Sequence, residues 1–329
     1  MSNAFETLEG GVQTTVQDYP GRIGYWDIGV PPSGPMDPVA FRLANLLVGN
    51  LEGEAGLEIT AVGPKLKFRD DSVVAITGAN IQASVNGEDL PMWESLRLRK
   101  GSVLSIGMIR GKGFRAYLGI AGGIDVPVFL GGKSTFPQGH LGGFEGRPLR
   151  NGDVLKIGAS RTPLPDIVGR KVDSSTRPTY QSLWEIGATP GPHADPDFLT
   201  ADDMAMLFSH RWRVHYNSNR SGYRLIGPKP RWARIDGGEA GRHPSNIHDT
   251  PYPIGAVNLT GDMPVILTAD GPSLGGFVSF ATVVSAELWK VGQAVPGTDQ
   301  IMFRKFSLQD ALKIRTEQET LIHTSIVSS

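Results

Sequence analysis

Turn-forming residues constrain this chain more than any other feature of its sequence. It holds 42 glycines and 24 prolines in 329 residues, spread throughout rather than gathered in one low-complexity segment. Gly and Pro at short intervals mark turns and leave little room for long helices. The short runs of Val, Ile and Leu between them predict strands at 73–77, 81–85, 103–106, 115–120, 154–157 and 265–269. This pattern is typical of a β-sandwich or β-barrel.

Helix-capping signals occur at three places. Asp37 followed by Pro38 is a helix start, and both Thr200 and Ser307 stand three residues before an Asp. The predicted helices span 38–48, 201–208 and 308–321. We therefore expect a mainly β protein with two barrel-like units and a few short helices.

The length favours about two domains. A stretch at 160–178 is rich in Pro, Ser, Thr and Arg and lacks periodicity, so we place a boundary there. The sequence predicts one subdomain over 5–165, a second over 175–306, and a C-terminal helix and tail over 307–329.

Composition excludes several functions. A net charge of −1 without a basic cluster argues against nucleic-acid binding, and the lack of Cys excludes thiolate metal sites and cysteine nucleophiles. No apolar run approaches the ~20 residues that span a bilayer, and no secretory signal opens the chain. The expectation is a cytoplasmic protein that contacts neither nucleic acid nor membrane.

Three motifs resemble known phosphate-binding, nucleophile or metal-binding sites. The stretch 132–135 resembles the end of a phosphate-binding loop, but Pro127 stands where that loop's first Gly belongs. Residues 271–275 fit G-x-S-x-G, yet Gly275 and Gly276 are poor helix starters after a nucleophile. His243 and His248 are five apart, a spacing that does not place them on one helical face. We interpret all three as turn or loop segments and expect no metal site.

Two other segments favour binding. Residues 16–37 place Ser33 in a Gly- and Pro-rich loop just before the helix that Asp37 caps. Residues 216–225 combine Asn217 and Asn219 with two Arg, a set of donors and acceptors that suits a small polar substrate or a carboxylate.

At these segments the chain resembles the biotin-dependent carboxyltransferase family, whose members are known as allophanate hydrolase subunit 2 or as the C subunit of 5-oxoprolinase. The matching stretches lie at 16–37, 121–135, 191–198 and 219–228, and the similarity runs from about 8 to 306. The sequence of residues 24–37 is most similar to that of the carboxyltransferase region of urea carboxylases. The resemblance implies two cyclophilin-type, β-barrel-like subdomains.

The resemblance also implies a two-step chemistry shared with other polypeptides or domains. A biotin carboxylase would use ATP and bicarbonate to carboxylate biotin on a carrier. This chain, with a second carboxyltransferase half similar to allophanate hydrolase subunit 1, would then move CO2 to a nitrogen of urea and form allophanate. The sequence has no biotin-attachment motif and no segment of the size of an ATP-binding domain.

Candidate site residues follow from the matched loops. We expect the substrate to be bound by Asn217, Asn219, Arg220, Tyr223, Ser33, Asp37, His193 and Asp195, and biotin to be admitted at Asp270, Gly275 and Gly276. Asn219 stands where some relatives have Asp, and a neutral amide suits urea better than the guanidinium cation. No general base is assigned.

Three alternatives remain at this point. The chain could be a 5-oxoprolinase component, a guanidine carboxylase component, or a regulatory module that binds a partner without turnover.

Overall fold

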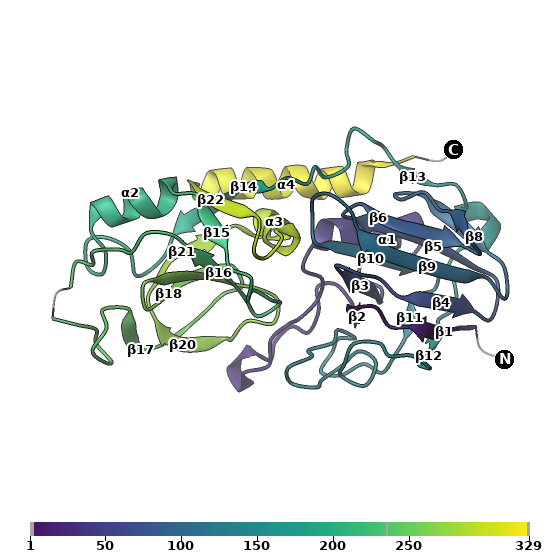
Figure 1. Cartoon of the computed structure of the whole chain (residues 1–329), viewed down its shortest axis with the longest axis horizontal. Coiled ribbons are helices and arrows are strands. Elements are labelled where there is room, and N and C mark those ends of the chain that lie inside the picture. The colour runs from purple at the N-terminus through teal and green to yellow at the C-terminus, as the bar shows by residue number, and fades with distance from the viewer. Residues whose placement is uncertain (1–2, 235, 328–329) are drawn as a thin grey trace. The chain divides into compact units, whose positions relative to one another are not determined.

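A computed structural model describes residues 3–234 and 236–327. Its contacts divide the chain into two compact units that are not contiguous in sequence (Figure 1). Unit 1 comprises residues 1–24, 32–180 and 319–329, and unit 2 comprises residues 25–31 and 181–318. The limits predicted above, 5–165, 175–306 and 307–329, stay a prediction of where domains begin and end.

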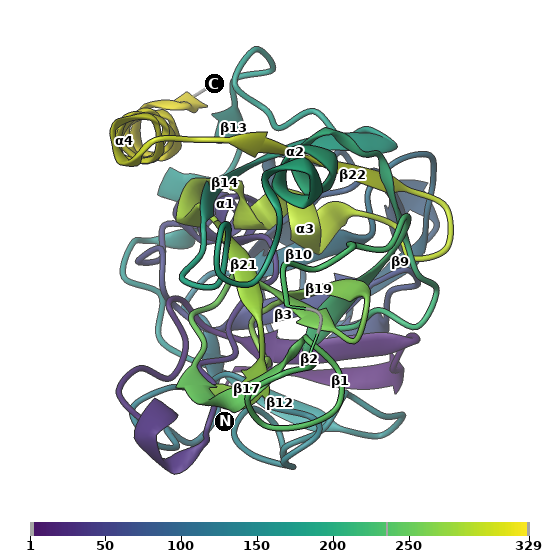
Figure 2. The same cartoon turned by 90° about the vertical axis from the view of Figure 1, so that its left-hand side faces the viewer.

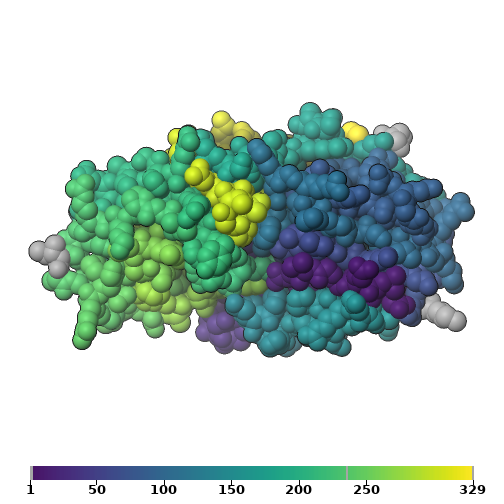
Figure 3. Space-filling model, viewed as in Figure 1, coloured from purple at the N-terminus to yellow at the C-terminus, as the bar shows by residue number. Residues whose placement is uncertain are grey.

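Unit 1 is built on two antiparallel sheets. The first has the strand order β11 (Ile124–Asp125), β12 (Val154–Ile157), β1 (Ala4–Glu9), β4 (Lys65–Phe68), β9 (Val103–Ile109), β6 (Ile81–Val85), β7 (Glu88–Asp89). The second has the order β2 (Gln13–Gln17), β3 (Gly56–Thr60), β10 (Arg115–Ile120), β5 (Ser72–Gly78), β8 (Ser95–Leu98). Strand β1 pairs with β12, and in Figure 3 the purple N-terminal strand lies beside teal atoms of the segment that contains β12.

The core of unit 1 lies between its sheets. Alternate residues of both sheets, with Phe5, Leu57, Leu66 and Leu118 among them, form one buried cluster. Helix α1 (Pro38–Leu47) packs against β5 and β10. A short pairing of β13 (Lys171–Val172) with β23 (Ile326–Val327) and the 3-10 turn η2 (Leu164–Ile167) complete the unit.

Unit 2 is a closed barrel, seen with α2 (Ala201–Ser209) in Figure 2. Its strand order is β14 (Leu183–Pro190), β21 (Ser279–Val283), β18 (Ala256–Thr260), β19 (Met263–Leu267), β16 (Gly222–Ile226), β15 (Trp212–Val214), β22 (Gln300–Lys305). The β14–β22 pair is parallel and closes a barrel whose other pairs are antiparallel.

Smaller elements surround the barrel. They are the pair β17 (Asn246–Pro251) and β20 (Leu274–Phe277), the helix α3 (Leu288–Gln293), and the 3-10 turns η1 (Trp26–Ile28) and η3 (Ser285–Glu287). Helix α4 (Leu308–Thr324) begins in unit 2 and ends in unit 1. The mainly β prediction with two barrel-like units is therefore confirmed, although α4, with 17 residues, is longer than the few short helices expected.

Candidate functional site

The loop before α1 is anchored by a fully buried set of polar groups in unit 1. The Asp37 carboxylate caps the helix by accepting a hydrogen bond from the Ala40 N–H at 3.0 Å. The Asp37 N–H donates to the Tyr117 hydroxyl at 2.7 Å, and this hydroxyl donates to Glu58 Oε2 at 2.9 Å. Burial, and then the charges of Glu58 and Asp37, raise the pKa of Tyr117, so its hydroxyl remains a donor. The predicted cap at Asp37 is confirmed.

Ser33 lies in this loop with an unusual backbone. Its φ is +59°, its exposed fraction is 4%, and its Oγ has no hydrogen-bond partner among residues 3–234 and 236–327. The next N–H, that of Gly34, donates to Gln17 Oε1 at 3.1 Å. A buried hydroxyl without a partner is uncommon and costs free energy, so Ser33 Oγ is a group that an external molecule could satisfy.

The two matched stretches of unit 1 are locked together. The Asp18 carboxylate accepts hydrogen bonds from the Lys133 N–H at 2.7 Å and from the Ser134 hydroxyl at 2.5 Å. The Gln17 amide donates to the Thr135 carbonyl at 3.1 Å. The hydrogen-bonding groups of residues 133–135 thus bind other groups of the protein. This agrees with the interpretation of 132–135 as a turn rather than a phosphate-binding loop.

Arg220 and Asp270 form a buried ion pair in unit 2. The Arg220 Nε and Nη2 atoms lie 2.8 and 3.0 Å from the two carboxylate oxygens, and the side chains are 4% and 3% exposed. The Thr268 hydroxyl and the Asp270 N–H both donate to the Arg220 carbonyl. Residues 50 positions apart thus hold the start of β16 against the end of β19 and the loop after it.

Asn219 is exposed beside this pair. Its Oδ1 accepts a hydrogen bond from the Ser221 N–H at 2.9 Å, so the turn uses the acceptor of the amide. Its Nδ2 has no hydrogen-bond partner in the described part of the chain. What Asn219 offers to a ligand is therefore a pair of N–H donors.

Asn217 and Tyr223 flank Asn219 differently. Asn217 is exposed, and its carbonyl accepts a hydrogen bond from Arg224 Nη1 at 2.7 Å. Tyr223 is fully buried in β16. Tyr223 therefore supports the strand from within the barrel, and its role in shaping a substrate pocket stays a prediction.

His193 attaches the 191–198 loop to β21. Its Nδ1 accepts the Ser279 N–H at 3.1 Å, and its own backbone N–H donates to the Ser279 carbonyl at the same distance. Burial lowers the pKa of His193, which keeps the ring neutral and able to accept. Asp195, joined to Pro196 by a cis peptide bond, is exposed.

The glycines of β20 meet the protein itself. A Cβ on Gly275 would lie 2.8 Å from the Tyr252 ring, and one on Gly276 would lie 2.8 Å from the Ile247 carbonyl. The Tyr252 hydroxyl accepts the Phe277 N–H at 2.6 Å and donates to the Phe277 carbonyl at 3.1 Å. Sequence reasoning missed Tyr252, because a lone tyrosine after a polar run gives no pattern.

The motifs interpreted above as turns or loops gain no support as separate sites. Strand β20, not a helix, follows Ser273. His243 does contact Ser245 and Asp262, but Ser245 is fully buried and unreachable for a substrate. Among residues 3–234 and 236–327, no group of three His, Cys, Asp or Glu is placed to hold a metal ion. No helix within the same ranges has the length and apolar character needed to cross a bilayer.

The chain is similar to a known protein family and to proteins of solved structure. The model of the carboxyltransferase domain, subdomains A and B, matches residues 28–305. Urea amidolyase of Saccharomyces cerevisiae is 49% identical over 97% of this chain, which spans only 17% of that protein. The structure of the K. lactis urea amidolyase superposes with a TM-score of 0.94 at 49% identity, covering all of this chain and 20% of that one.

A second kind of relative has nearly the same length as this chain. The C subunit of 5-oxoprolinase from Escherichia coli is 34% identical, with 95% of this chain and 94% of that protein covered. The match at 28–305 and these identities show that the chain belongs to the carboxyltransferase family with subdomains A and B.

Proposed function

We propose that this chain is one half of the carboxyltransferase component of a biotin-dependent urea carboxylase. The observation that carries the proposal is the difference in identity among relatives matched over the same part of the chain. Identity is 49% to the yeast urea amidolyase and 44% to a putative urea carboxylase of Emericella nidulans, against 34% to the 5-oxoprolinase component of Escherichia coli. The reaction would move CO2 from carboxybiotin to a urea nitrogen and give allophanate.

Asn219 is the residue that we propose to recognise the substrate. Its two free N–H donors can hydrogen-bond the urea carbonyl oxygen, and its neutral amide does not attract a cation. The Arg220–Asp270 pair would position Asn219, because Arg220 is the next residue in the chain. The Asp270 carboxylate holds the Arg220 side chain and the Thr268 hydroxyl holds its carbonyl, and both groups come from the segment that follows β19. Ser33, Asp37, His193, Asp195, Asn217 and Tyr223 remain proposed members of the substrate site.

The second substrate, carboxybiotin, would come from a carrier domain, with a biotin carboxylase that uses ATP and bicarbonate as a further partner. Carboxybiotin supplies the CO2 to be transferred. Asp270, Gly275 and Gly276 remain the proposed place at which biotin is admitted; Asp270 is held there by its pair with Arg220, and both glycines lie close to Tyr252 or Ile247. These three residues shape the loop around 271–276, and we derive no chemical step from them.

Reconstitution tests the proposal. The chain is mixed with a second carboxyltransferase half, a biotin carboxylase and a biotinylated carrier, and bicarbonate-dependent ATP turnover is measured with urea, guanidine or 5-oxoproline. Urea-stimulated turnover that requires the chain supports the proposal. Stimulation by 5-oxoproline instead would favour the second candidate, which the 34% identity to the C subunit of 5-oxoprolinase from Escherichia coli supports. Partner binding without stimulation by any substrate would indicate a regulatory module.

Substitution of Asn219 by Asp provides the sharper test of the substrate. The carboxylate can keep the turn to Ser221 but replaces the free donors by an acceptor with a negative charge. We expect the urea-to-guanidine ratio of kcat/KM to fall roughly tenfold or more, because hydrogen bonds to charged groups contribute about 1.5–3 kcal/mol. Asn151→Asp, at an exposed asparagine of unit 1 whose Oδ1 also accepts a backbone N–H, adds the same charge outside the candidate site and serves as the control. An unchanged ratio in Asn219→Asp would contradict the assignment.

A further inference from the structure

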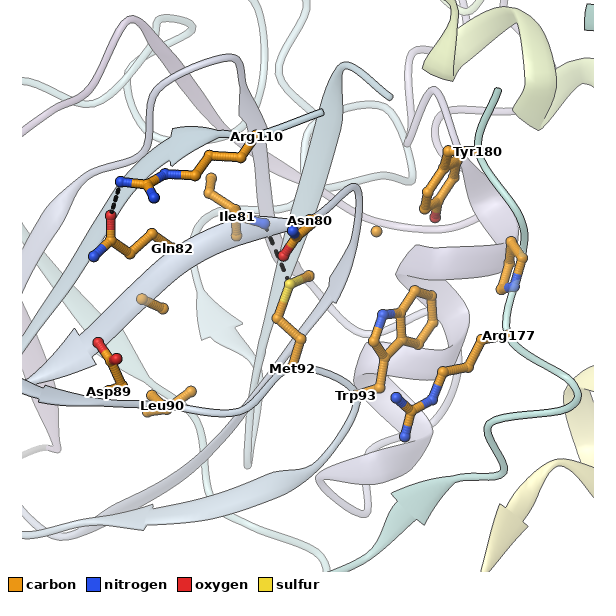
Figure 4. Close-up of a pocket in the computed structure, with 13 residues that line it drawn as sticks. Asn80, Ile81, Gln82, Asp89, Leu90, Met92, Trp93, Arg110, Arg177 and Tyr180 are labelled. Atoms are coloured by element: carbon orange, nitrogen blue, oxygen red, sulfur yellow. Dashed lines mark hydrogen bonds between the residues drawn. The ribbon is translucent and has the colours of Figure 1, made fainter. Parts of the chain in front are cut away.

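The open hollow of unit 1 shown in Figure 4 does not gather its polar groups at one point. Its volume is about 660 Å³, and the guanidinium groups of Arg110 and Arg177 lie at opposite ends of it, with Met92 and Trp93 between them. Polar groups of unit 1 converge elsewhere, on a carboxylate that is closed off from solvent. This carboxylate belongs to Glu58, in the middle of β3, and Glu58 is not among the residues proposed to bind the substrate.

Glu58 places a charge inside unit 1, in a strand whose other residues are buried as well. It is 1% exposed, and its neighbours Leu57 and Ile59 belong to the buried apolar cluster. Its Oε1 atom lies 3.6 Å from Nε of Arg115, which is also 1% exposed. Replacing a buried ion pair by apolar residues of similar size is often neutral or stabilising, so stability alone does not account for this pair.

The other carboxylate oxygen of Glu58 holds the loop that carries Ser33. Glu58 Oε2 accepts hydrogen bonds from the Met36 N–H at 2.7 Å and from the Tyr117 hydroxyl at 2.9 Å. The Tyr117 hydroxyl in turn accepts the Asp37 N–H at 2.7 Å. One oxygen atom therefore fixes two successive backbone N–H groups, one directly and one through Tyr117. Because Tyr117 and Glu58 are paired across β10 and β3, the sheet itself sets the place of both groups.

Ser33 is the residue of this loop that needs such support. Its φ of +59° is costly for a residue with a side chain, and its buried Oγ has no hydrogen-bond partner among residues 3–234 and 236–327. A loop without anchors would relax to a conformation in which this hydroxyl meets water or a backbone group. The hydrogen bonds at Met36 and Asp37, three and four residues later, oppose that relaxation.

We propose that Glu58 is a positioning residue of the candidate site: through Met36 and Tyr117 it keeps the 33–37 loop in place, so that the Ser33 hydroxyl stays available to hydrogen-bond the substrate. The proposal rests on the proposed function, in which Ser33 belongs to the substrate site. A carboxylate is suited to this task, because hydrogen bonds to an ionised acceptor are stronger than those between neutral groups. Glu58 itself is too deeply buried to touch the substrate.

Tyr117→Phe tests the positioning in the reconstituted carboxyltransferase. It removes the hydroxyl that links Glu58 to the Asp37 N–H and changes little else in shape. We expect the KM for the substrate that stimulates turnover to rise about three- to tenfold, the range that the loss of one hydrogen bond gives. The kcat should change by less than about twofold, because the reacting groups are untouched. Glu58→Gln keeps an oxygen that can accept the Met36 N–H and should raise KM less.

Thr77→Val is the matched control. The Thr77 hydroxyl is fully buried and donates to the Ala40 carbonyl of α1 at 2.6 Å, so this variant loses a buried hydrogen bond to the same helix but outside the 33–37 loop. It should lower the midpoint of thermal unfolding and leave KM unchanged. A merely structural role of the Glu58 network would give Tyr117→Phe the same result as this control.

Two further measurements show whether the network acts on the loop and through Ser33. In a Ser33→Ala background, Tyr117→Phe should raise KM by less than about twofold, because the hydroxyl to be positioned is already gone. In the purified chain, without any substrate or partner, the N–H groups of Met36 and Asp37 should exchange with solvent faster in Tyr117→Phe than in wild type or Thr77→Val. Hydrogen exchange followed by NMR measures this.

The outcomes separate this proposal from the proposed function. Unchanged exchange at Met36 and Asp37 would show that the network does not hold the loop and would overturn the proposal. An unchanged KM in Tyr117→Phe, or an equal rise with and without Ser33, would also overturn it and leave the proposed function intact. If the wild-type complex turned over none of urea, guanidine and 5-oxoproline, the proposed function would fail and the positioning role with it.

Discussion

Arg220 combines a recognisable binding chemistry with a structural use. Its place in the sequence, beside two asparagines, predicts contact with a substrate. In the structure the Nε and Nη2 atoms, one edge of its guanidinium, face the two carboxylate oxygens of Asp270, and neither side chain is more than 4% exposed. No sequence pattern pairs these two residues, because they are 50 positions apart and meet only when β16 and β19 are neighbours in the barrel.

Breaking this pair should be costly. Arg220→Met leaves a buried carboxylate without its partner, and we expect the free energy of unfolding to fall by about 3–5 kcal/mol. The exposed pair Arg304–Glu185, with side chains 53% and 50% exposed, is the matched control, and Arg304→Met should cost about 0–1 kcal/mol. Thermal or denaturant unfolding measures both. Equal losses would show that burial does not determine the contribution of the pair.

His193 predicts a pH dependence of stability. Burial lowers its pKa below the ordinary value of 6.5, and its neutral Nδ1 accepts the Ser279 N–H. The unfolded chain therefore takes up a proton at a higher pH than the folded chain. The contribution of His193 is complete above about pH 6.5 and is lost as the pH falls through that value toward the folded-state pKa.

A His193→Asn variant isolates this contribution, because an amide oxygen can accept the same hydrogen bond without titrating. Between about pH 7 and pH 5, on either side of the ordinary histidine pKa, wild type should lose more stability than the variant. The midpoint of thermal unfolding at each pH measures the loss. Parallel curves for the two proteins would contradict the assignment.

At the scale of elements, the sequence predicts a local structure where the residues that determine it are close neighbours in the chain. The capping box of Thr200 and Asp203 starts α2, and Asn86 and Gly87, with φ of +52° and +93°, form the turn between β6 and β7. Helix α3 was missed because it has six residues and no side-chain cap. Strand β17 was missed because its polar sequence does not alternate, and its pairing with β20 depends on distant contacts such as Tyr252 with Phe277.

The β17–β20 pair should tolerate no side chain at Gly275. Gly275→Ala would place a Cβ 2.8 Å from the Tyr252 ring and push its hydroxyl away from Phe277. Overpacking of this kind costs about 1–3 kcal/mol. Gly107→Ala is the control, because its Cβ would make only an ordinary contact at 3.4 Å. Unfolding midpoints compare the two, and an equally small effect of both would mean that Tyr252 moves aside freely.

At the scale of the molecule, the chain returns to unit 1 after completing unit 2. Arg42, in α1, binds Glu319, 277 residues later, through two hydrogen bonds at 2.8 and 2.6 Å, and binds Glu52 as well. Burial opposes the charge of Arg42, but these hydrogen bonds outweigh it and raise its pKa. The sequence predicts a helix over 308–321 but does not show that the end of this helix belongs to unit 1. No local pattern can show it, because the contact between Arg42 and Glu319 joins residues 277 positions apart.

Helix α4 therefore offers a test of how unit 1 is completed. Ile322 is fully buried, whereas Leu312, on the same helix, is 53% exposed. Ile322→Ala removes packing from the returning segment, and we expect it to lower the free energy of unfolding by about 2–5 kcal/mol. Leu312→Ala should change it by no more than about 0.5 kcal/mol. Since both variants lose similar apolar side chains from one helix, equal effects in denaturant unfolding would show that the C-terminal segment does not stabilise the unit into which it folds.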